Sequence, residues 1–242
     1  MSDLTVYASQ SAAFGNGVKS ALLSVFSLVL AGTYLGLGAL AHDFGFTEWW
    51  FALSTILVWA APAQVILLSS LGTGATVVQA AVAVTLSAIR LLPMLVALLP
   101  LLRSKGTRFR DLLLPTHFTA ISMWVESLRL LPGIAPEYRI PFCNGLGVGY
   151  MSTALVFGFL GYYLAAGLPP LLAATLLFLT PMSFLMSTAR NARMLVDRAA
   201  FGLGLVIGPA LAWYHVELDL MWTGVIGGAL AYGVHRLRGA LA

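Results

Sequence analysis

Residues 49–89 read WWFALSTILVWAAPAQVILLSSLGTGATVVQAAVAVTLSAI, a run of 41 positions without Asp, Glu, Lys or Arg. A helix needs about 20 apolar residues to cross the hydrocarbon layer of a bilayer, so this run is long enough for two crossings. The turn signal Gly72-Thr73-Gly74 divides it. A second uncharged run lies between Arg139 and Arg190 and is divided by Gly167-Leu168-Pro169-Pro170. Both patterns indicate pairs of membrane-spanning helices.

The composition agrees with this interpretation. Charged residues make up 9% of the chain, whereas soluble domains carry about 25%, so this chain cannot cover a water-facing surface. The single cysteine, Cys143, excludes a disulfide framework and a Cys-based zinc site. The basic residues cluster in short connectors, which is an orientation signal and not a nucleic-acid-binding stripe. We therefore predict an all-α polytopic membrane protein, one transmembrane domain over residues 1–242, with the lipid bilayer around it and no nucleic acid, metal or cofactor.

The number of spans depends on one short segment. Seven segments approach or reach the length of a span: 18–41, 49–71, 75–101, 141–166, 169–189, 199–215 and 219–235. The stretch between Asp111 and Glu126 is shorter and contains Pro115 and His117. If it crosses, there are eight spans, and the loop cations divide eight inside to four outside; if it re-enters or lies flat, they divide eleven to one. The positive-inside rule favours seven spans plus one short re-entrant or flat helix. No basic region precedes the first apolar run, so we expect no cleaved signal peptide.

An internal repeat is visible in the two halves. Phe14-Gly15-Asn16-Gly17 opens the first span, and Phe142-Cys143-Asn144-Gly145 opens the fourth. The span after each opening contains a proline, Pro62 or Pro181. With the short segment not crossing, we predict two inverted three-helix repeats with proline-broken second helices, a plan typical of secondary transporters. Repeat one covers 14–101, a connector with the short helix covers 102–140, repeat two covers 141–215, and the final span and tail cover 216–242. Chance recurrence of Gly, Pro and Asn is the alternative.

Polar groups inside the apolar runs are the candidate site residues, because they are costly there. Proline removes a backbone donor and frees carbonyl groups in mid-span, where a substrate carboxylate or ammonium can partner the exposed backbone. The candidates at the two breaks are Pro62, Ala63 and Gln64 in the first half and Thr180, Pro181 and Ser183 in the second. A plain proline kink satisfied by a neighbouring helix is the alternative.

Two charged or titratable positions add to this set. Arg90 lies thirteen residues, about 20 Å of helix, before Arg103, too far to reach the interface, so it faces the protein interior or an aqueous cavity. It is a candidate clamp for a carboxylate or a charge relay, with a structural pairing as the alternative. His117 is a candidate proton carrier or an ordinary interfacial histidine. Glu126, one turn before Arg129, is expected at a solvated helix end.

Several of these features together resemble the AzlC family. They are the Phe-x-x-Gly run at Phe14, the Ala60-Ala61-Pro62-Ala63-Gln64 break, the Arg90 segment and the Thr180-Pro181 break, and the likeness covers roughly residues 14–215. The family is the large subunit of branched-chain amino acid exporters, paired with a small AzlD-like membrane subunit. The resemblance implies proton-driven export of small hydrophobic amino acids across the bacterial inner membrane. This chain lacks the acidic pair that family members tend to show near Pro115-Thr116-His117-Phe118, so we hypothesise that His117 titrates instead.

Other functions remain open at this stage. The sequence contains no Walker A loop, HExxH or GxSxG motif, so ATP hydrolysis and common hydrolase chemistry have no visible machinery. The leading interpretation is a secondary transporter and not an enzyme. The first alternative is an obligate membrane subunit of a larger complex, inactive alone. The second is a membrane-embedded lipid enzyme, for which His117 with Glu126 is the only support.

Overall fold

The computed structural model describes residues 4–89, 91–104, 106–167, 195–214 and 219–240, together with the single positions 182, 185, 189 and 216. Within these ranges the chain is helical, without a β-strand; one isolated β-bridge joins Thr5 to Ile134. The chain divides into two compact units, Met1–Thr180 and Pro181–Ala242. This is an all-α fold, as the sequence predicted.

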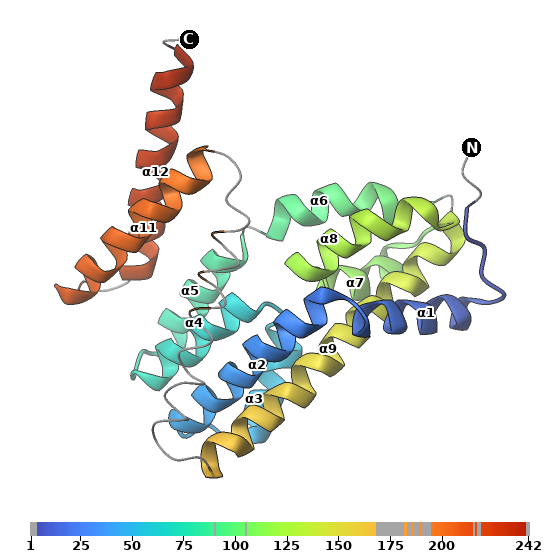
Figure 1. Ribbon diagram of the computed structural model, residues 1–242, viewed down its shortest axis with the longest axis horizontal. Helices are drawn as coiled ribbons and strands as arrows, with labels where there is room; N and C mark the ends of the chain where they lie inside the picture. Colours follow the sequence, from blue (N-terminus) through green and yellow to red (C-terminus); the bar gives the residue numbers. More distant parts are fainter. Residues whose placement is uncertain are drawn as a thin grey trace. The chain divides into compact units, whose positions relative to one another are not determined.

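Within its described residues the first unit carries ten helical elements, of which the α-helices are labelled in Figure 1. They are α1 (Gln10–Leu22), α2 (Val25–Asp43), α3 (Glu48–Leu57), α4 (Ala61–Gly72), α5 (Val77–Ala88), α6 (Leu91–Leu102), α7 (Phe109–His117), α8 (Ile121–Leu130), the 3-10 turn η1 (Leu131–Gly133) and α9 (Pro136–Gly167). In the second unit, α11 (Leu195–Trp213) and α12 (Asp219–Ala240) pack as an antiparallel pair, with Gly208 next to Thr223 and Gly227 next to Leu203.

Side-chain caps fix where several of these helices begin. Ser9, Ser24, Thr47 and Thr76 each precede a helix and accept a hydrogen bond from a backbone N–H in its first turn. Such caps satisfy backbone donors that have no partner inside the helix. Helices α4 and α8 differ, because Ala60 and Ala120 precede them and supply no side-chain cap.

Three of the described helices are long and apolar enough to cross a bilayer: Val25–Asp43, Pro136–Ala165 and Leu195–Trp213. Helices α5 and α6 together form a fourth candidate, bent by 48°. The predicted span 49–71 is divided into α3 and α4, and the predicted span 169–189 lies mostly outside the described residues. The fold is therefore that of an all-α membrane protein with at least one interrupted helix.

Glycines allow α1 and α2 to pack directly on α9. A methyl group added at Gly17 would overlap the carbonyl oxygen of Phe142, and one added at Gly145 would overlap that of Phe14. The two Phe-x-Asn-Gly motifs thus face each other across one helix crossing. Further along, Gly38 lies against the backbone of Gly158. Small residues at a crossing let helix backbones approach closely, which is how helices associate in lipid.

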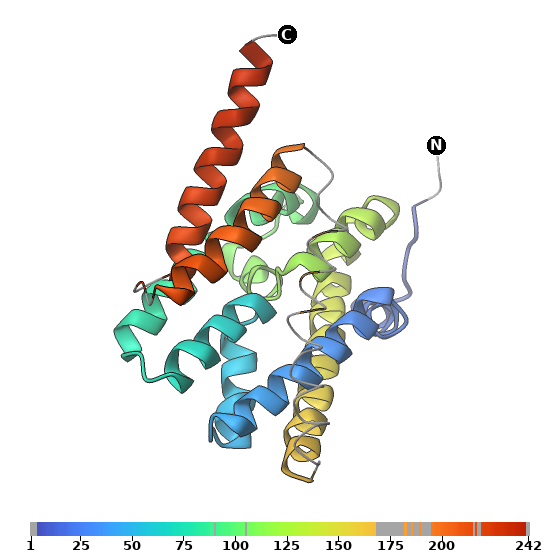
Figure 2. The ribbon, with the colours of Figure 1, turned by 60° about the vertical axis from the view of Figure 1, so that its left-hand side comes forward.

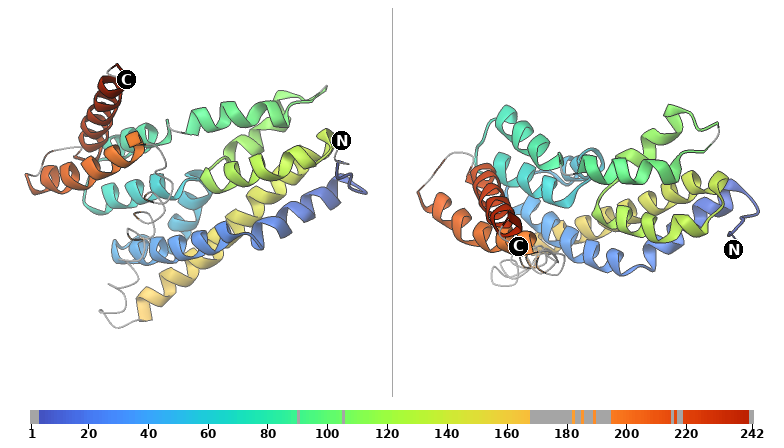
Figure 3. Two further views of the ribbon diagram at one scale, coloured as in Figure 1. Left: turned by 45° about the horizontal axis from the view of Figure 1, so that its top comes forward. Right: turned by 90° about the horizontal axis from the view of Figure 1, so that it is seen from above.

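These contacts also show that the segment formed by α1 and α2 runs in the same direction as α9. The residue numbers of the paired positions increase together along both segments, from Gly17 with Phe142, through Ser24 with Tyr150 and Ser27 with Thr153, to Gly38 with Gly158. Figures 1 to 3 show α1, α2 and α9 side by side in this parallel arrangement.

The prediction of inverted three-helix repeats is therefore wrong. It required the spans 18–41 and 141–166 to run in opposite directions, with two crossings between them. Parallel neighbours that both cross the bilayer enter it from the same side, so an odd number of crossings separates them. Of the two orders considered from the sequence, the eight-span order has three crossings there and accommodates the observed direction.

Candidate functional site

The clearest candidate site is the interruption between α3 and α4. Helix α3 ends at Leu57, and α4 begins at Ala61 with Pro62 in its first turn. A proline suits the first turn of a helix, whereas a helix continuing through it would bring its ring against the carbonyl four residues earlier. The chain between the two helices is extended at Ala60, and the Ala60 N–H donates to the Val58 carbonyl oxygen at 2.8 Å. The predicted break is confirmed, and it lies just before Pro62.

Gln64 joins the two sides of this break. Its Nε2 donates to Ser54 Oγ at 3.0 Å and to Thr55 Oγ1 at 2.7 Å, and both hydroxyls donate in turn to the Phe51 carbonyl oxygen. The Gln64 side chain is completely buried, and its Oε1 has no hydrogen-bond partner. A buried amide oxygen without a donor costs free energy, so this acceptor is available to a ligand that brings an N–H group.

Pro62 and Ala63, the other two site residues predicted at this break, lie beside Gln64 at the start of α4. Pro62 is half-buried, and Ala63 is buried in the first turn of α4. Because the first N–H groups of a helix carry partial positive charge, and α4 has no side-chain cap, this end favours an anionic group such as a carboxylate.

A second interrupted helix meets the first. Helix α7 ends at His117 and α8 begins at Ile121, and the Phe118 carbonyl oxygen at this second break accepts a hydrogen bond from Trp59 Nε1 at 2.9 Å. In return, His117 Nε2 lies 2.8 Å from the carbonyl oxygen of Ile56, in the last turn of α3. A carbonyl oxygen can only accept, so Nε2 of His117 carries a proton here and Nδ1 is left for a second one. Each break therefore supplies a side-chain donor, Trp59 or His117, to a backbone carbonyl group at the other break.

Aromatic rings pack around the first break. Trp59 stacks on Tyr34 with ring centroids 6.3 Å apart, and Phe118 meets Trp59 edge-on at 6.4 Å. All three side chains are buried. The hydrogen bond from Trp59 to the Phe118 carbonyl oxygen therefore lies in an apolar surrounding, where hydrogen bonds are stronger than in water.

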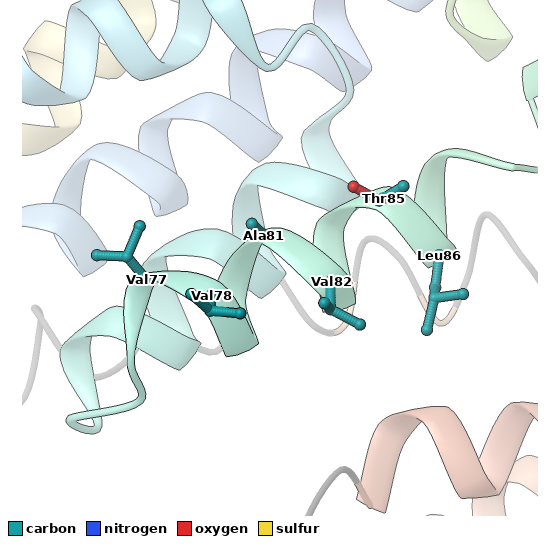
Figure 4. A pocket seen from close by; sticks show the side chains of 6 residues that line it. All are labelled: Val77, Val78, Ala81, Val82, Thr85 and Leu86. Carbon is teal, nitrogen blue, oxygen red and sulfur yellow. The ribbon is translucent and has the colours of Figure 1, made fainter.

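An aliphatic groove adjoins the same break. A hollow of about 270 Å³ lies between α4 and α5 and is lined by Val58, Leu67, Leu71, Ala81, Val84 and Thr85, among others. Val58 belongs to the break, and Leu67 and Leu71 lie one and two turns beyond Gln64 on α4. A neighbouring hollow of about 370 Å³ extends along α5, and Figure 4 shows the side chains that line it. Apart from Thr85, the named lining is aliphatic, which suits a small hydrophobic substituent.

The remaining predicted site residues are not all placed. Arg90, Thr180, Pro181 and Ser183 lie outside the described residues. His117 lies at the end of α7, beside the first break.

Glu126 is a residue that the sequence analysis misjudged. It was expected at a solvated helix end, but its side chain is buried within α8 and pairs with the exposed Arg129. Glu126 pairs with Arg129, whereas His117 contacts the Ile56 carbonyl oxygen. The described residues therefore show no contact between Glu126 and His117 that would support the lipid-enzyme alternative. The spacing of Glu126 and Arg129, three residues apart, predicts that they lie on one helix face, but it carries no signal that Glu126 is buried.

Taken together, the fold and the site define a class of protein: an all-α membrane protein with polar side chains, among them Gln64 and Trp59, at its helix interruptions. The family model for the AzlC protein matches residues 6–168, and the chain belongs to this family. The match includes Phe14, Pro62, Gln64, Arg90 and His117. No curated protein and no solved structure matches the chain. Family and helices together indicate a membrane protein with a transport-related role.

Proposed function

We propose that the chain is the large subunit of a secondary transporter that exports small hydrophobic amino acids of the branched-chain type across the bacterial inner membrane. The observation that carries this proposal is the buried, unpartnered Oε1 of Gln64 at a helix break in a chain of the AzlC family. Transporters commonly bind substrate where interrupted helices expose backbone groups near the middle of the bilayer. The chain has a binding role and not an enzymatic one.

In this proposal the substrate has three contacts. Its ammonium group donates to Oε1 of Gln64, and its carboxylate faces the uncapped start of α4, with Arg90 as the cationic partner. Its aliphatic side chain enters the groove that begins at Val58. Residues Thr180, Pro181 and Ser183 are proposed to supply the matching surface from the second half of the chain. Because Gln64 is completely buried, binding and release require α3 and α4 to separate from their neighbours, as alternating access demands.

The test is a flux measurement in sealed vesicles. The full chain is reconstituted alone and together with a small AzlD-like membrane subunit, and movement of radiolabelled valine, leucine and isoleucine is followed under an imposed proton gradient. We expect saturable flux that requires the partner and that Arg90→Ala abolishes. Flux with the chain alone would show that transport does not require the partner subunit. Unaltered flux in Arg90→Ala would remove Arg90 from the site, and no flux of any of these amino acids would contradict the proposed substrate.

His117 gives a first prediction about proton coupling. His117→Gln keeps an N–H donor for the Ile56 carbonyl oxygen but cannot be protonated near neutral pH. We expect this variant to transport with a flattened pH dependence in the near-neutral range. His117→Ala, which also removes the donor, should lower the rate at every pH. The measurement is initial flux from pH 5.5 to 8.5, roughly the range that brackets imidazole titration. An unchanged pH profile in His117→Gln would exclude His117 as a titrating group of the transport cycle.

A further inference from the structure

Glu126 is a buried carboxylate to which the proposed transport site gives no role. It lies in α8, with a side chain that is only 5% exposed, and both its oxygens accept hydrogen bonds from the guanidinium of Arg129. The two residues are three positions apart on one helix. A carboxylate in the interior of a membrane protein is expensive and usually marks a functional site.

Only the glutamate of this ion pair is buried. The side chain of Arg129 is 65% exposed, in contrast to that of Glu126. Breaking a buried ion pair is normally costly because one charge is left in the interior without a partner. Here, protonation of Glu126 removes the buried charge of the pair, and Arg129 keeps its solvation. The pair can therefore open by taking up one proton, without leaving a charge stranded.

The helix that carries this carboxylate packs against three elements. They are α6, α9 and η1. Helix α6 and η1 contain no titratable residue, and on α9 the titratable group that interacts with both Glu126 and Arg129 is Tyr150. The Tyr150 hydroxyl lies 2.9 Å from Ser24 Oγ, at the junction of α1 and α2. Cys143 of α9 is the other nearby titratable group and contacts Ser127 of α8 at 3.5 Å.

Helix α8 also connects this carboxylate to the candidate substrate site. The helix begins at the second break, where the Phe118 carbonyl oxygen accepts from Trp59 and His117 contacts Ile56. A movement of α8 would therefore act on the second break and, through these two hydrogen bonds, on the break that Gln64 spans. No other carboxylate within the described part of the first unit combines such burial with a contact to this helix.

We propose that Glu126 is a proton-binding site of the transport cycle. In the conformation described here, it is deprotonated and held by Arg129. A proton from the aqueous phase binds one carboxylate oxygen, the two hydrogen bonds that Arg129 donates within α8 are lost, and the charge interaction between Glu126 and Tyr150 of α9 is lost with them. The same proton leaves when the pair re-forms. This inference rests on the proposed transport function and adds to it the group that links proton movement to the helix breaks.

The test compares two fluxes in the same vesicles containing the reconstituted transporter with its partner subunit. One is proton-driven movement of radiolabelled leucine, and the other is exchange of leucine for leucine without a gradient. We expect Glu126→Gln to lower the ratio of driven to exchange flux at least about tenfold, a change of about 1.4 kcal/mol. Glu137→Gln, the same change at an exposed position in α9, should keep the wild-type ratio. A wild-type ratio in Glu126→Gln overturns the inference.

A second variant keeps the inference testable if Glu126→Gln does not fold. Arg129→Gln leaves the carboxylate in place and removes the cation that stabilises its charged form. Without this cation the deprotonated carboxylate is buried with no partner, so the ratio of driven to exchange flux should fall. An unchanged ratio contradicts the inference. Absence of both driven and exchange flux in the wild-type transporter would instead overturn the proposed function and this inference with it.

Discussion

Gly38→Ala should destabilise the folded chain by about 1–3 kcal/mol or more, although it adds a single methyl group. That methyl group would overlap the carbonyl oxygen of Gly158 and crowd the backbone nitrogen of Tyr162. Because both neighbours are backbone atoms, neither can turn aside as a flexible side chain would. The helices α2 and α9 would have to separate, and the direct packing of the first unit would be lost. The measurement is the thermal unfolding midpoint of the purified protein in detergent.

Gly32→Ala is the matched control, since Gly32 lies on the same helix and a methyl group added there meets no atom within 4 Å. Replacing an unconstrained helical glycine by alanine is expected to be neutral or to stabilise by up to about 1 kcal/mol. The variant Gly161→Ala, whose methyl group would overlap the Leu35 carbonyl oxygen, should behave like Gly38→Ala. Equal unfolding midpoints for Gly38→Ala and Gly32→Ala would show that α2 and α9 are not packed as described.

Gln64→Leu should reduce leucine flux by about 10- to 100-fold while the protein remains folded. A hydrogen bond to a charged group contributes about 1.5–3 kcal/mol, which corresponds to that range of rates or affinities. Folding should survive, because the hydroxyls of Ser54 and Thr55 keep their hydrogen bonds to the Phe51 carbonyl oxygen. The measurement is initial flux in vesicles, corrected for the amount of folded protein.

Gln10→Leu makes the same chemical change at an exposed position at the start of α1 and should leave flux unchanged. Gln64→Glu distinguishes the role of the amide further. A carboxylate keeps an acceptor for the ammonium group but cannot donate to Ser54 and Thr55 as the Nε2 group does. We expect it to retain more flux than Gln64→Leu. If Gln64→Leu transported like the wild type, the break between α3 and α4 would not be the substrate site.

The break and its polar residue were predictable from the sequence because their causes are local. Pro62 cannot continue a helix without a clash four residues back, and a glutamine within an uncharged run is costly unless it has partners. The partners of Gln64 were not predictable. Ser54 and Thr55 lie on α3, across a break whose geometry depends on residues that no periodicity reveals.

The direction of the helices was predicted wrongly for a physical reason. The positive-inside rule favoured seven spans, and the short segment was counted only as far as Glu126, which was expected at a solvated helix end. The structure buries Glu126 and pairs it with Arg129, so the helical stretch continues to Leu130. Because Glu126 and Arg129 form an ion pair on one helix face, they do not end an apolar segment as an unpaired charge would. The Phe14 and Phe142 motifs were recognised as similar, but their meeting at one crossing required the three-dimensional fold.

The most direct test of the central claim is protection of the α3–α4 break by substrate. In a Cys143→Ser background, Ala61→Cys places a thiol at the half-buried start of α4, and Ser11→Cys places one at an exposed position of α1 as control. The rate of labelling by a small thiol reagent is measured with and without saturating leucine. We predict that leucine slows labelling of Ala61→Cys several-fold and leaves Ser11→Cys unaffected. Equal rates at Ala61→Cys, in a variant that still transports leucine, would contradict the account.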